Sequence, residues 1–537
     1  MGQPIPQRNI ALAGQVASPG LAAGPLVLLR ESVVATPVLP TGIAGLDRLE
    51  AARALASAEI AELASGADTE AAEILEFQIA MLEDDSLVEP VREGVGAGGD
   101  LGTAWRAALD AMVAEYEAAE DAYFRGRAAD IRDIRDRVLR HLAGAAAERL
   151  PSGAIVVADD LTPSRFLEAD WSGGGLALLR GSVSSHVAML ARARGVPMLV
   201  DLAIVDLAGH AQALLDAEQG ALLLSPDDSA RRSFDRRMGE AGAAREQVRQ
   251  YLHRPAVTAK GERVTVLVNI ADPAELAAID PATCDGIGLT RTEFLFHSHA
   301  GLPDEAAQYA VYRRIVEWAG GKPVTIRTLD AGGDKPIPGL TLDGETNPFL
   351  GLRGIRLSLR RPEIFGIQLR ALARAAAHGP LKIMLPMVTA PAEVAAARSL
   401  LDIAVAELNA AGITAAKPPL GIMVEVPAAA IAVDEFDADF FSIGSNDLVQ
   451  YVTACSRDSS SLTALARPDG TAVLRLIRTV VEHGRRTGRE VSLCGDMGGD
   501  VRYLPKLLDC GLRTVSVAPA ALANAKATIA AYGAGNG

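Results

Sequence analysis

The stretch Gly421-Ile-Met-Val-Glu425 is a short apolar run that ends in a carboxylate, and Phe440-Phe-Ser-Ile-Gly444 repeats the pattern just before Asn446 and Asp447. Runs so short and so apolar are typical of strands that are buried on both faces, because such strands lose the polar alternation of an exposed sheet. Each run therefore predicts a buried strand with polar side chains at its C-terminal end.

Six more runs of this kind surround these two and alternate with helical segments. They are 264–269, 286–291, 324–327, 381–386, 491–494 and 514–517. Eight such units within residues 259–537 match the usual size of a closed (β/α)8 TIM barrel. An open, doubly wound sheet is the alternative, but the regularity of the eight units favours closure.

The first half of the chain has a different composition. Residues 31–144 are rich in Ala, Leu and Glu with apolar side chains at helical spacings, which predicts an inserted helical domain. Short apolar runs in residues 1–30 and 145–228 predict an α/β domain that flanks this insertion. The charged stretch 229–258 has few apolar positions and predicts a linker helix. We therefore predict an α/β multidomain fold that ends in the barrel.

The charge of the chain is unevenly distributed. Its 537 residues contain 52 Lys and Arg against 67 Asp and Glu, a net charge of −15. Residues 46–140 alone hold 22 acidic and 10 basic residues, a net charge of −12. Such a surface repels nucleic acid and attracts a basic protein partner, with a solvated helical face as the alternative.

The sequence also indicates in which compartment of the cell we expect the protein. No apolar run reaches the roughly 20 residues of a membrane helix, so we expect no membrane insertion. The start Met1-Gly-Gln-Pro-Ile-Pro6 lacks the basic and apolar segments of a secretory signal. The four cysteines show no C-x-x-C spacing, which argues against a disulfide scaffold or a zinc ribbon. These features predict a cytoplasmic protein.

Charged or polar side chains stand at the ends of five predicted strands. They are Arg291, Arg327, Glu425, Asn446 with Asp447, and Cys494. Because the active sites of barrels lie where the strands end, we expect these side chains to converge on one pocket. Arginine matches phosphate or carboxylate with its planar fork, and Mg²⁺ takes one or two carboxylates from proteins. The pattern predicts a site for a small phosphorylated acid, with structural ion pairs as the alternative.

Two further residues carry reactive side chains. Cys494 is either a buried core thiol or, at the mouth of such a pocket, a proton donor. His186 lies between a predicted strand, 175–179, and a predicted helix, 187–193. An imidazole at a helix start can accept a phosphoryl group that the free backbone N–H groups stabilise, whereas a capping or packing histidine is the alternative.

These features occur together with longer motifs. They are Ala17-Ser-Pro-Gly-Leu-Ala-Ala-Gly24, Ser184-Ser-His186, Gly288-Leu-Thr-Arg-Thr-Glu-Phe-Leu-Phe296, Ile326-Arg-Thr-Leu-Asp-Ala-Gly-Gly-Asp-Lys335, Asn347-Pro-Phe-Leu-Gly-Leu-Arg353, Val424-Glu-Val-Pro427, Ser442-Ile-Gly-Ser-Asn-Asp-Leu448 and Cys494-Gly495. In this order, and over essentially its whole length, the sequence resembles the enzyme I family of the bacterial phosphoenolpyruvate (PEP)-dependent sugar phosphotransferase system. The resemblance implies a swivelling α/β phosphohistidine domain with the helical insertion, followed by the PEP-binding barrel.

The resemblance also implies a role for each site residue. His186 would accept the phosphoryl group of PEP, and Cys494 would protonate the enolate to give pyruvate. The substrate would be held by Arg291, Arg327, Arg353, Asn446, Asp447 and Arg457. Glu425 and Asp447 would bind Mg²⁺. The acidic helical insertion would dock the small phosphocarrier protein HPr, and the barrel would form a homodimer.

Two alternatives remain. A pyruvate phosphate dikinase or PEP synthase shares the histidine domain and the barrel, but carries a large ATP-grasp domain upstream, whereas 185 acidic and helical residues precede His186 here. A regulatory paralogue would use the acidic helices only for binding. The sequence departs from the family pattern at Ser182 and Val183, and at Asp496, where glutamate is usual.

Overall fold

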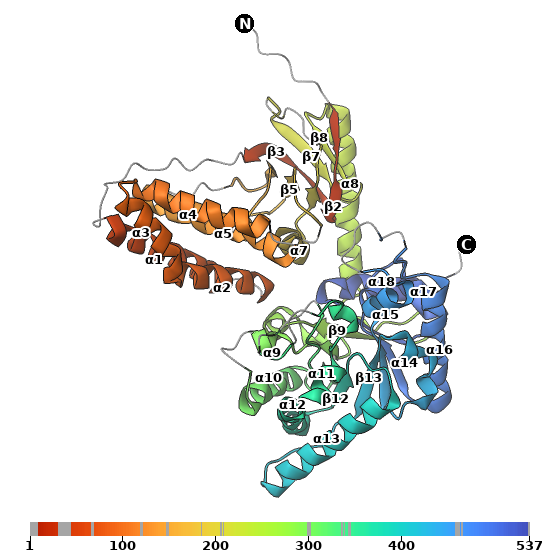
Figure 1. Ribbon diagram of the computed structural model, residues 1–537. Coiled ribbons are helices and arrows are strands. Elements are labelled where there is room, and N and C mark those ends of the chain that lie inside the picture. Colours follow the sequence, from red (N-terminus) through yellow and green to blue (C-terminus); the bar gives the residue numbers. More distant parts are fainter. Residues whose placement is uncertain are drawn as a thin grey trace. The chain divides into compact units, whose positions relative to one another are not determined.

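The computed structural model describes residues 9–29, 45–65, 69–118, 122–145, 150–183, 185–203, 207, 209–297, 302–333, 337, 339–341, 345–456, 462 and 465–534. The chain divides into two compact units, Met1–Ala243 and Ala244–Gly537 (Figure 1).

The second unit contains a closed barrel of eight parallel strands. They are β9 (Thr265–Ile270), β10 (Ile287–Thr290), β11 (Val324–Arg327), β12 (Leu381–Leu385), β13 (Leu420–Val424), β14 (Phe440–Ile443), β15 (Glu490–Leu493) and β16 (Thr514–Val517). Neighbouring strands pair in sequence order, and β16 pairs with β9 to close the ring. The predicted (β/α)8 barrel is confirmed.

Helices surround this barrel (Figure 1). They are α9 (Phe294–His297), α10 (Glu305–Trp318), α11 (Ile355–Arg360), α12 (Pro362–Ala375), α13 (Pro391–Ala410), α14 (Pro427–Ile431), α15 (Ser445–Thr453), α16 (Thr471–Thr487), α17 (Leu504–Asp509) and α18 (Leu522–Ala531). Outward strand residues such as Ile326 and Ile422 join the large core between strands and helices. A separate cluster consists of Leu289, Met384, Met423, Phe440 and Cys494. The strands are mostly apolar because both faces are covered, and polar side chains such as Thr325, Arg327 and Ser442 lie among the apolar ones.

The first unit is built on an eight-stranded sheet. Its strands are β1 (Ile10–Ala13), β2 (Gln15–Ser18), β3 (Leu21–Leu29), β4 (Ile155–Ala158), β5 (Gly175–Leu178), β6 (Met198–Val200), β7 (Gln212–Asp216) and β8 (Ala221–Leu224). Their order is β1-β8-β7-β3-β4-β5-β6-β2. The section from β3 to β6 is parallel, while the other pairs are antiparallel. The helices α6 (Pro163–Glu168) and α7 (His186–Arg194) follow β4 and β5 in the chain.

Between β3 and β4, the described residues form five α-helices. They are α1 (Leu46–Ser65), α2 (Thr69–Glu83), α3 (Val88–Gly96), α4 (Leu101–Glu117) and α5 (Ala122–Leu142). They have a core of their own, in which Leu49, Trp105 and Ile131 are fully buried. The helical character predicted for this part of the chain is confirmed.

The helix α8 (Asp228–Arg249) crosses the boundary between the two units, which falls after Ala243. Phe234 is the one buried residue of this helix, so the helix is largely exposed. Within the described parts of the chain, no helix is both long enough and apolar enough to span a membrane.

Candidate active site

The C-terminal ends of the barrel strands carry the side chains that the sequence singled out. Arg327 is the last residue of β11, and Glu425 and Cys494 directly follow β13 and β15. Asp447 lies in the first turn of α15, which follows β14. All four side chains are buried. Because the strands are parallel, these ends meet at one mouth of the barrel.

Arg327 is held by two carboxylates. Its Nη2 donates to both oxygens of Glu293, at 3.1 Å each, and its Nη1 lies 2.9 Å from Oδ2 of Asp330. Its buried Nε has no hydrogen-bond partner among the described residues. Arg327 is therefore fixed in position and still has a donor to offer to an anion.

Arg353 is more completely engaged, with only 1% of its surface exposed. Its Nε and Nη2 donate to Oδ1 and Oδ2 of Asp330, at 3.0 and 3.1 Å. The same guanidinium donates to Asp447, from Nη2 to Oδ2 at 3.1 Å and from Nη1 to Oδ1 at 3.4 Å. Arg353 thus joins two buried carboxylates.

Glu293 and Asp330 are site residues that the sequence analysis did not identify. Each lies in a motif quoted above, 288–296 and 326–335, but not at the end of a strand. A signal was present, since a buried arginine needs a carboxylate partner and each of these acids is the nearest one to a strand-ending arginine in the sequence. Their pairing with Arg327 and Arg353 depends on the folded loops.

Glu425 is 1% exposed and accepts a hydrogen bond from the Met387 backbone N–H at 2.6 Å. Burial, together with the charges of Asp447 and Asp330, raises its pKa above the ordinary range despite the opposing charge of Arg327. The backbone of Gly444 lies close to this carboxylate, since a Cβ added to Gly444 would lie 3.0 Å from Oε2 of Glu425. Among the described residues, the mouth therefore holds more buried carboxyl groups than buried guanidinium groups, and a cation bound there would favour the ionised form of Glu425.

The metal-binding potential of the site is limited to a few side chains. Among the described residues, no three His, Cys, Asp or Glu side chains are grouped to hold a metal ion by themselves. Glu425 and Asp447 are two hard oxygen ligands, and Mg²⁺ takes just one or two carboxylates from proteins, with water and substrate oxygens completing its shell. The residues present therefore fit Mg²⁺ better than a metal that needs a full protein cage.

Cys494 lies in the apolar cluster described above, beside Met384, Met423 and Phe440. Its Sγ donates to the Ile443 carbonyl at 3.7 Å. Burial raises the pKa of the thiol to about 11. The side chain therefore keeps its proton at neutral pH, as a proton donor must.

The remaining predicted barrel residues differ in their surroundings. Asn446 donates from Nδ2 to Oδ2 of Asp496 at 3.1 Å, and its Oδ1 accepts from the Asp496 backbone N–H at 3.0 Å. Arg291 follows β10 and has an exposed side chain. Arg457 lies outside the described residues.

His186 is the first residue of α7, in the first unit of the chain. Ser185 caps this helix, and its side chain accepts from the Ala188 backbone N–H at 3.3 Å. The preceding loop is held by Arg192, whose Nη1 donates to the carbonyls of Ala17 and Val183 at 2.8 Å each. The side chain of His186 and the whole of Ser184 lie outside the described part of the structure. His186 thus occupies the helix start that the sequence predicted.

Three models of known protein families match separate parts of the chain. Residues 245–533 match a family model described as "PEP-utilising enzyme, PEP-binding domain". Residues 13–127 match "PEP-utilising enzyme, N-terminal", and residues 150–220 match "PEP-utilising enzyme, mobile domain".

Several curated proteins are similar to this chain over most of its length. A phosphoenolpyruvate-protein phosphotransferase of Geobacillus stearothermophilus is 35% identical over 503 residues, which cover 90% of this chain and 86% of that protein. One of Priestia megaterium is 33% identical over 499 residues, covering 90% and 87%. Multiphosphoryl transfer protein 1 of Escherichia coli is 33% identical over 518 residues, covering 94% of this chain and 62% of that longer protein. The chain belongs to the family of the PEP-utilising enzymes and, within it, to the phosphoenolpyruvate-protein phosphotransferases.

Proposed function

We propose that this enzyme moves the phosphoryl group of PEP to His186 and then to a small phosphocarrier protein of the HPr type, releasing pyruvate. The single observation that supports this most is the mouth of the barrel, where the buried Arg327 and Arg353 lie beside buried carboxylates, within the region that matches the PEP-binding domain. In the sugar phosphotransferase system this would be the first step of uptake.

The substrate would bind through the arginines. Arg327 has a free buried donor, Nε, and is fixed by Glu293 and Asp330, so little reorganisation is needed when the phosphate binds. Arg291 and Arg457 would complete the phosphate site, and Asn446 would contact the substrate. Arg353 belongs to the same cluster through Asp330.

Mg²⁺ would be held by Glu425 and Asp447. The support is the burial of Glu425 which, together with the nearby charges of Asp447 and Asp330, raises the pKa of this carboxyl group. When bound, Mg²⁺ would supply positive charge that stabilises the phosphate and enolate oxygens.

The transfer would proceed in two steps that the protein's side chains control. A ring nitrogen of His186 attacks phosphorus, and the P–N bond forms as the P–O bond to the enol oxygen breaks. The electron pair of the broken bond stays on the oxygen and gives the enolate of pyruvate. The Cys494 thiol then delivers its proton to C3 of the enolate, and the thiolate recovers a proton from solvent. The raised pKa of Cys494, about 11, favours this recovery.

The parts of the chain would divide the work. Residues 1–30 and 145–228 would form the phosphohistidine domain, and residues 31–144 would dock the carrier through their net negative charge. Residues 229–258 would act as the linker helix on which the histidine domain moves, and residues 259–537 would bind PEP and dimerise. We place the enzyme in the cytoplasm, where its substrate is made.

Radioactive labelling tests this proposal. The full chain is incubated with ³²P-PEP and Mg²⁺, with a His186→Ala variant in parallel. We expect acid-labile, base-stable label on the native protein, none on the variant, and loss of the label when HPr is added. Labelling from ATP would favour a dikinase, and no labelling from either donor would favour a regulatory paralogue.

A further inference from the structure

We propose that Asp330 is a positioning residue that couples the phosphate-binding side of the barrel mouth to its metal-binding side. This inference rests on the proposed function, in which Arg327 holds phosphate and Asp447 holds Mg²⁺. Asp330 touches neither ligand in this assignment. It acts through the two arginines that it contacts.

A continuous row of charged groups connects the two sides. Arg327 contacts Asp330, Asp330 contacts Arg353, and Arg353 contacts Asp447, at 2.9, 3.0 and 3.1 Å for the closest pairs of atoms. Asp330 uses both carboxylate oxygens for Arg353, and its Oδ2 serves Arg327 as well. The position of each group in the row therefore depends on its neighbours.

Burial makes this row stiff. Asp330 is 0% exposed, and water is largely excluded from both of its arginine partners. Two buried guanidinium groups repel each other unless an anion lies between them, and Asp330 provides that anion. Breaking a buried pair leaves an uncompensated charge, so no member of the row moves without cost to the others.

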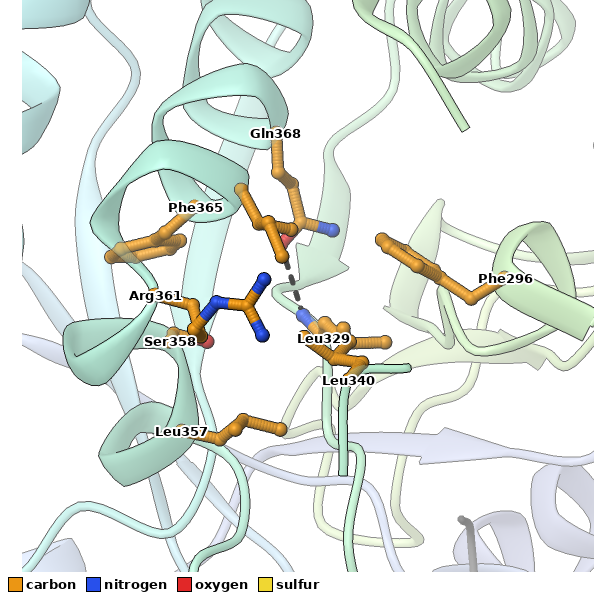
Figure 2. Close-up of a pocket in the computed structure, with 9 residues that line it drawn as sticks. Phe296, Leu329, Leu340, Leu357, Ser358, Arg361, Phe365 and Gln368 are labelled. Carbon is orange, nitrogen blue, oxygen red and sulfur yellow. Dashed lines mark hydrogen bonds between the residues drawn. The ribbon is translucent and has the colours of Figure 1, made fainter. Parts of the chain in front are cut away.

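The backbone that carries Asp330 is fixed as well. Its N–H donates to Oε1 of Glu293 at 3.1 Å. The preceding N–H, of Leu329, donates to Oε1 of the buried Gln368 at 3.0 Å, which Figure 2 shows as a dashed line. The cavity beside this bond is lined mainly by apolar side chains and has a volume of about 10 Å³, enough for about one water molecule. The carboxylate is thus held from both its side chain and its main chain.

The backbone beside Arg353 also leaves no room for larger side chains. Gly354, directly after Arg353, has a φ of 59°, and an added Cβ would lie 2.9 Å from Cβ of Met387 and 3.3 Å from Oδ1 of Asp330. Gly332 has a φ of 103°, and its Cβ would lie 2.7 Å from the Leu352 carbonyl oxygen. Glycine is required at both positions, and this close approach sets Arg353 against Asp330.

Glu293 provides the matched comparison. Its carboxylate binds Arg327 and the Asp330 backbone N–H, whereas Asp330 binds both Arg327 and Arg353. Removing the charge of Glu293 should loosen the phosphate side, whereas removing that of Asp330 should loosen both sides and the connection between them. The difference between the two variants therefore measures the coupling.

The experiment uses the full-length chain with His186→Ala, which prevents phosphoryl transfer and allows equilibrium binding to be measured. PEP binding is followed by calorimetry with and without Mg²⁺. Mn²⁺ binding is followed by the electron paramagnetic resonance of the free ion, with and without PEP. Asp330→Asn is compared with Glu293→Gln and with Glu305→Gln, which removes an ion pair with Arg370 and Arg374 between the outer helices.

We expect PEP to tighten Mn²⁺ binding by about tenfold in the parent protein, a usual size for coupled sites. Asp330→Asn should raise the dissociation constant of PEP by about tenfold or more and abolish the effect of PEP on Mn²⁺. Glu293→Gln should weaken PEP binding while retaining the effect on Mn²⁺, and Glu305→Gln should change neither.

An effect of PEP on Mn²⁺ that survives in Asp330→Asn would overturn the inference and leave the proposed function intact. If the parent protein binds no PEP at all, the proposed function fails. Circular dichroism checks that each variant is folded. Should Asp330→Asn not fold, Arg353→Lys takes its place, because an ammonium keeps the charge but cannot bridge two carboxylates, and it should abolish the coupling in the same way.

Discussion

Two regions of this molecule bury charged side chains, and they differ in the balance of those charges. At the barrel mouth, four carboxylates (Glu293, Asp330, Glu425 and Asp447) surround Arg327 and Arg353. In the first unit, the buried Arg137 of α5 donates to Glu59 of α1, at 2.7 Å, and to Ser164 and Glu168 of α6 at 3.0 and 2.6 Å.

The difference shows how the buried charges of an active site can be distinguished from buried charges that only stabilise the fold. The α5 network joins three helices, and the carboxylates of Glu59, Asp133 and Glu168 are matched by the guanidinium groups of Arg137, Arg140 and Arg165. Among the residues that the structure describes, the barrel network has more carboxylates than arginines, and it lies where parallel strands end. Buried charge alone therefore does not identify an active site. Position distinguishes the barrel network, because the active sites of barrels lie where the strands end.

The largest effect should come from Cys494→Ala. Without its proton donor, the enolate must be protonated by water, and general acid catalysis contributes about 10²–10⁴-fold. We expect the rate of pyruvate release to fall by about that factor, measured by coupled assay with HPr in excess. Equilibrium binding of PEP in the His186→Ala background should be nearly unchanged. A Cys494→Ala enzyme with native turnover would show that the proton comes from elsewhere.

Arg137→Gln tests the scaffold side of the comparison. Breaking a buried pair by removing one partner costs about 3–5 kcal/mol. We expect the first unit to lose stability of this order, while PEP binding by the barrel stays the same. Urea unfolding of the full chain is followed at Trp105, which is buried among the helices, after Trp171 and Trp318 are replaced by Phe. Weaker PEP binding in Arg137→Gln would contradict the assignment of this network as scaffold.

Part of the difference between the two regions could be predicted from the sequence. Arg327, Glu425, Asp447 and Cys494 could be identified because each follows an apolar run, and the fold places all of them at one mouth. The contact of Asp330 with Arg327 is local in the sequence. The contacts of Glu293 with Arg327 and of Asp330 with Arg353 could not be predicted, because these pairs lie 34 and 23 residues apart and meet only through folded loops. The helical insertion could be identified from its composition, but its bond from Arg137 to α6 spans separate segments.

Asp130 allows a pH test of the helical region. Burial raises the pKa of Asp130 to about 6, although pairing with Arg127 opposes the shift. The folded state therefore favours the protonated form of Asp130. The stabilisation that this side chain provides is complete below about pH 4 and is lost as the pH rises through about 6. Asp130→Asn cannot ionise. We therefore expect the variant to match the native protein near pH 4 and to exceed its stability by up to about 3 kcal/mol at pH 7.

The same Trp105 signal measures this difference across the pH range. A native protein that gains stability over Asp130→Asn between pH 4 and 7 would contradict the raised pKa. The result would then mean that the ion pair with Arg127 outweighs the burial of the carboxylate.

The smallest effect concerns α8, which joins the two units. Gly239 and Gly242 lie in this helix near the unit boundary, and a Cβ at either position would meet nothing within 4 Å. Glycine there costs about 1 kcal/mol of helix stability relative to alanine without a packing reason. We expect Gly239→Ala with Gly242→Ala to stiffen the helix and slow phosphoryl transfer to HPr a few-fold, whereas Gly366→Ala in α12 should not. Equal rates in all three proteins would exclude these glycines as a hinge.

The most direct test of the account is to locate the phosphoryl group itself. The native enzyme is charged with PEP and Mg²⁺, digested at alkaline pH and analysed by tandem mass spectrometry, with ³¹P resonance spectra of the intact protein as a second readout. We predict one phosphoramidate, on His186, whose signal disappears when pyruvate is added in excess and the transfer is reversed. Phosphate on any other side chain, or none on a protein that binds PEP, would contradict the account.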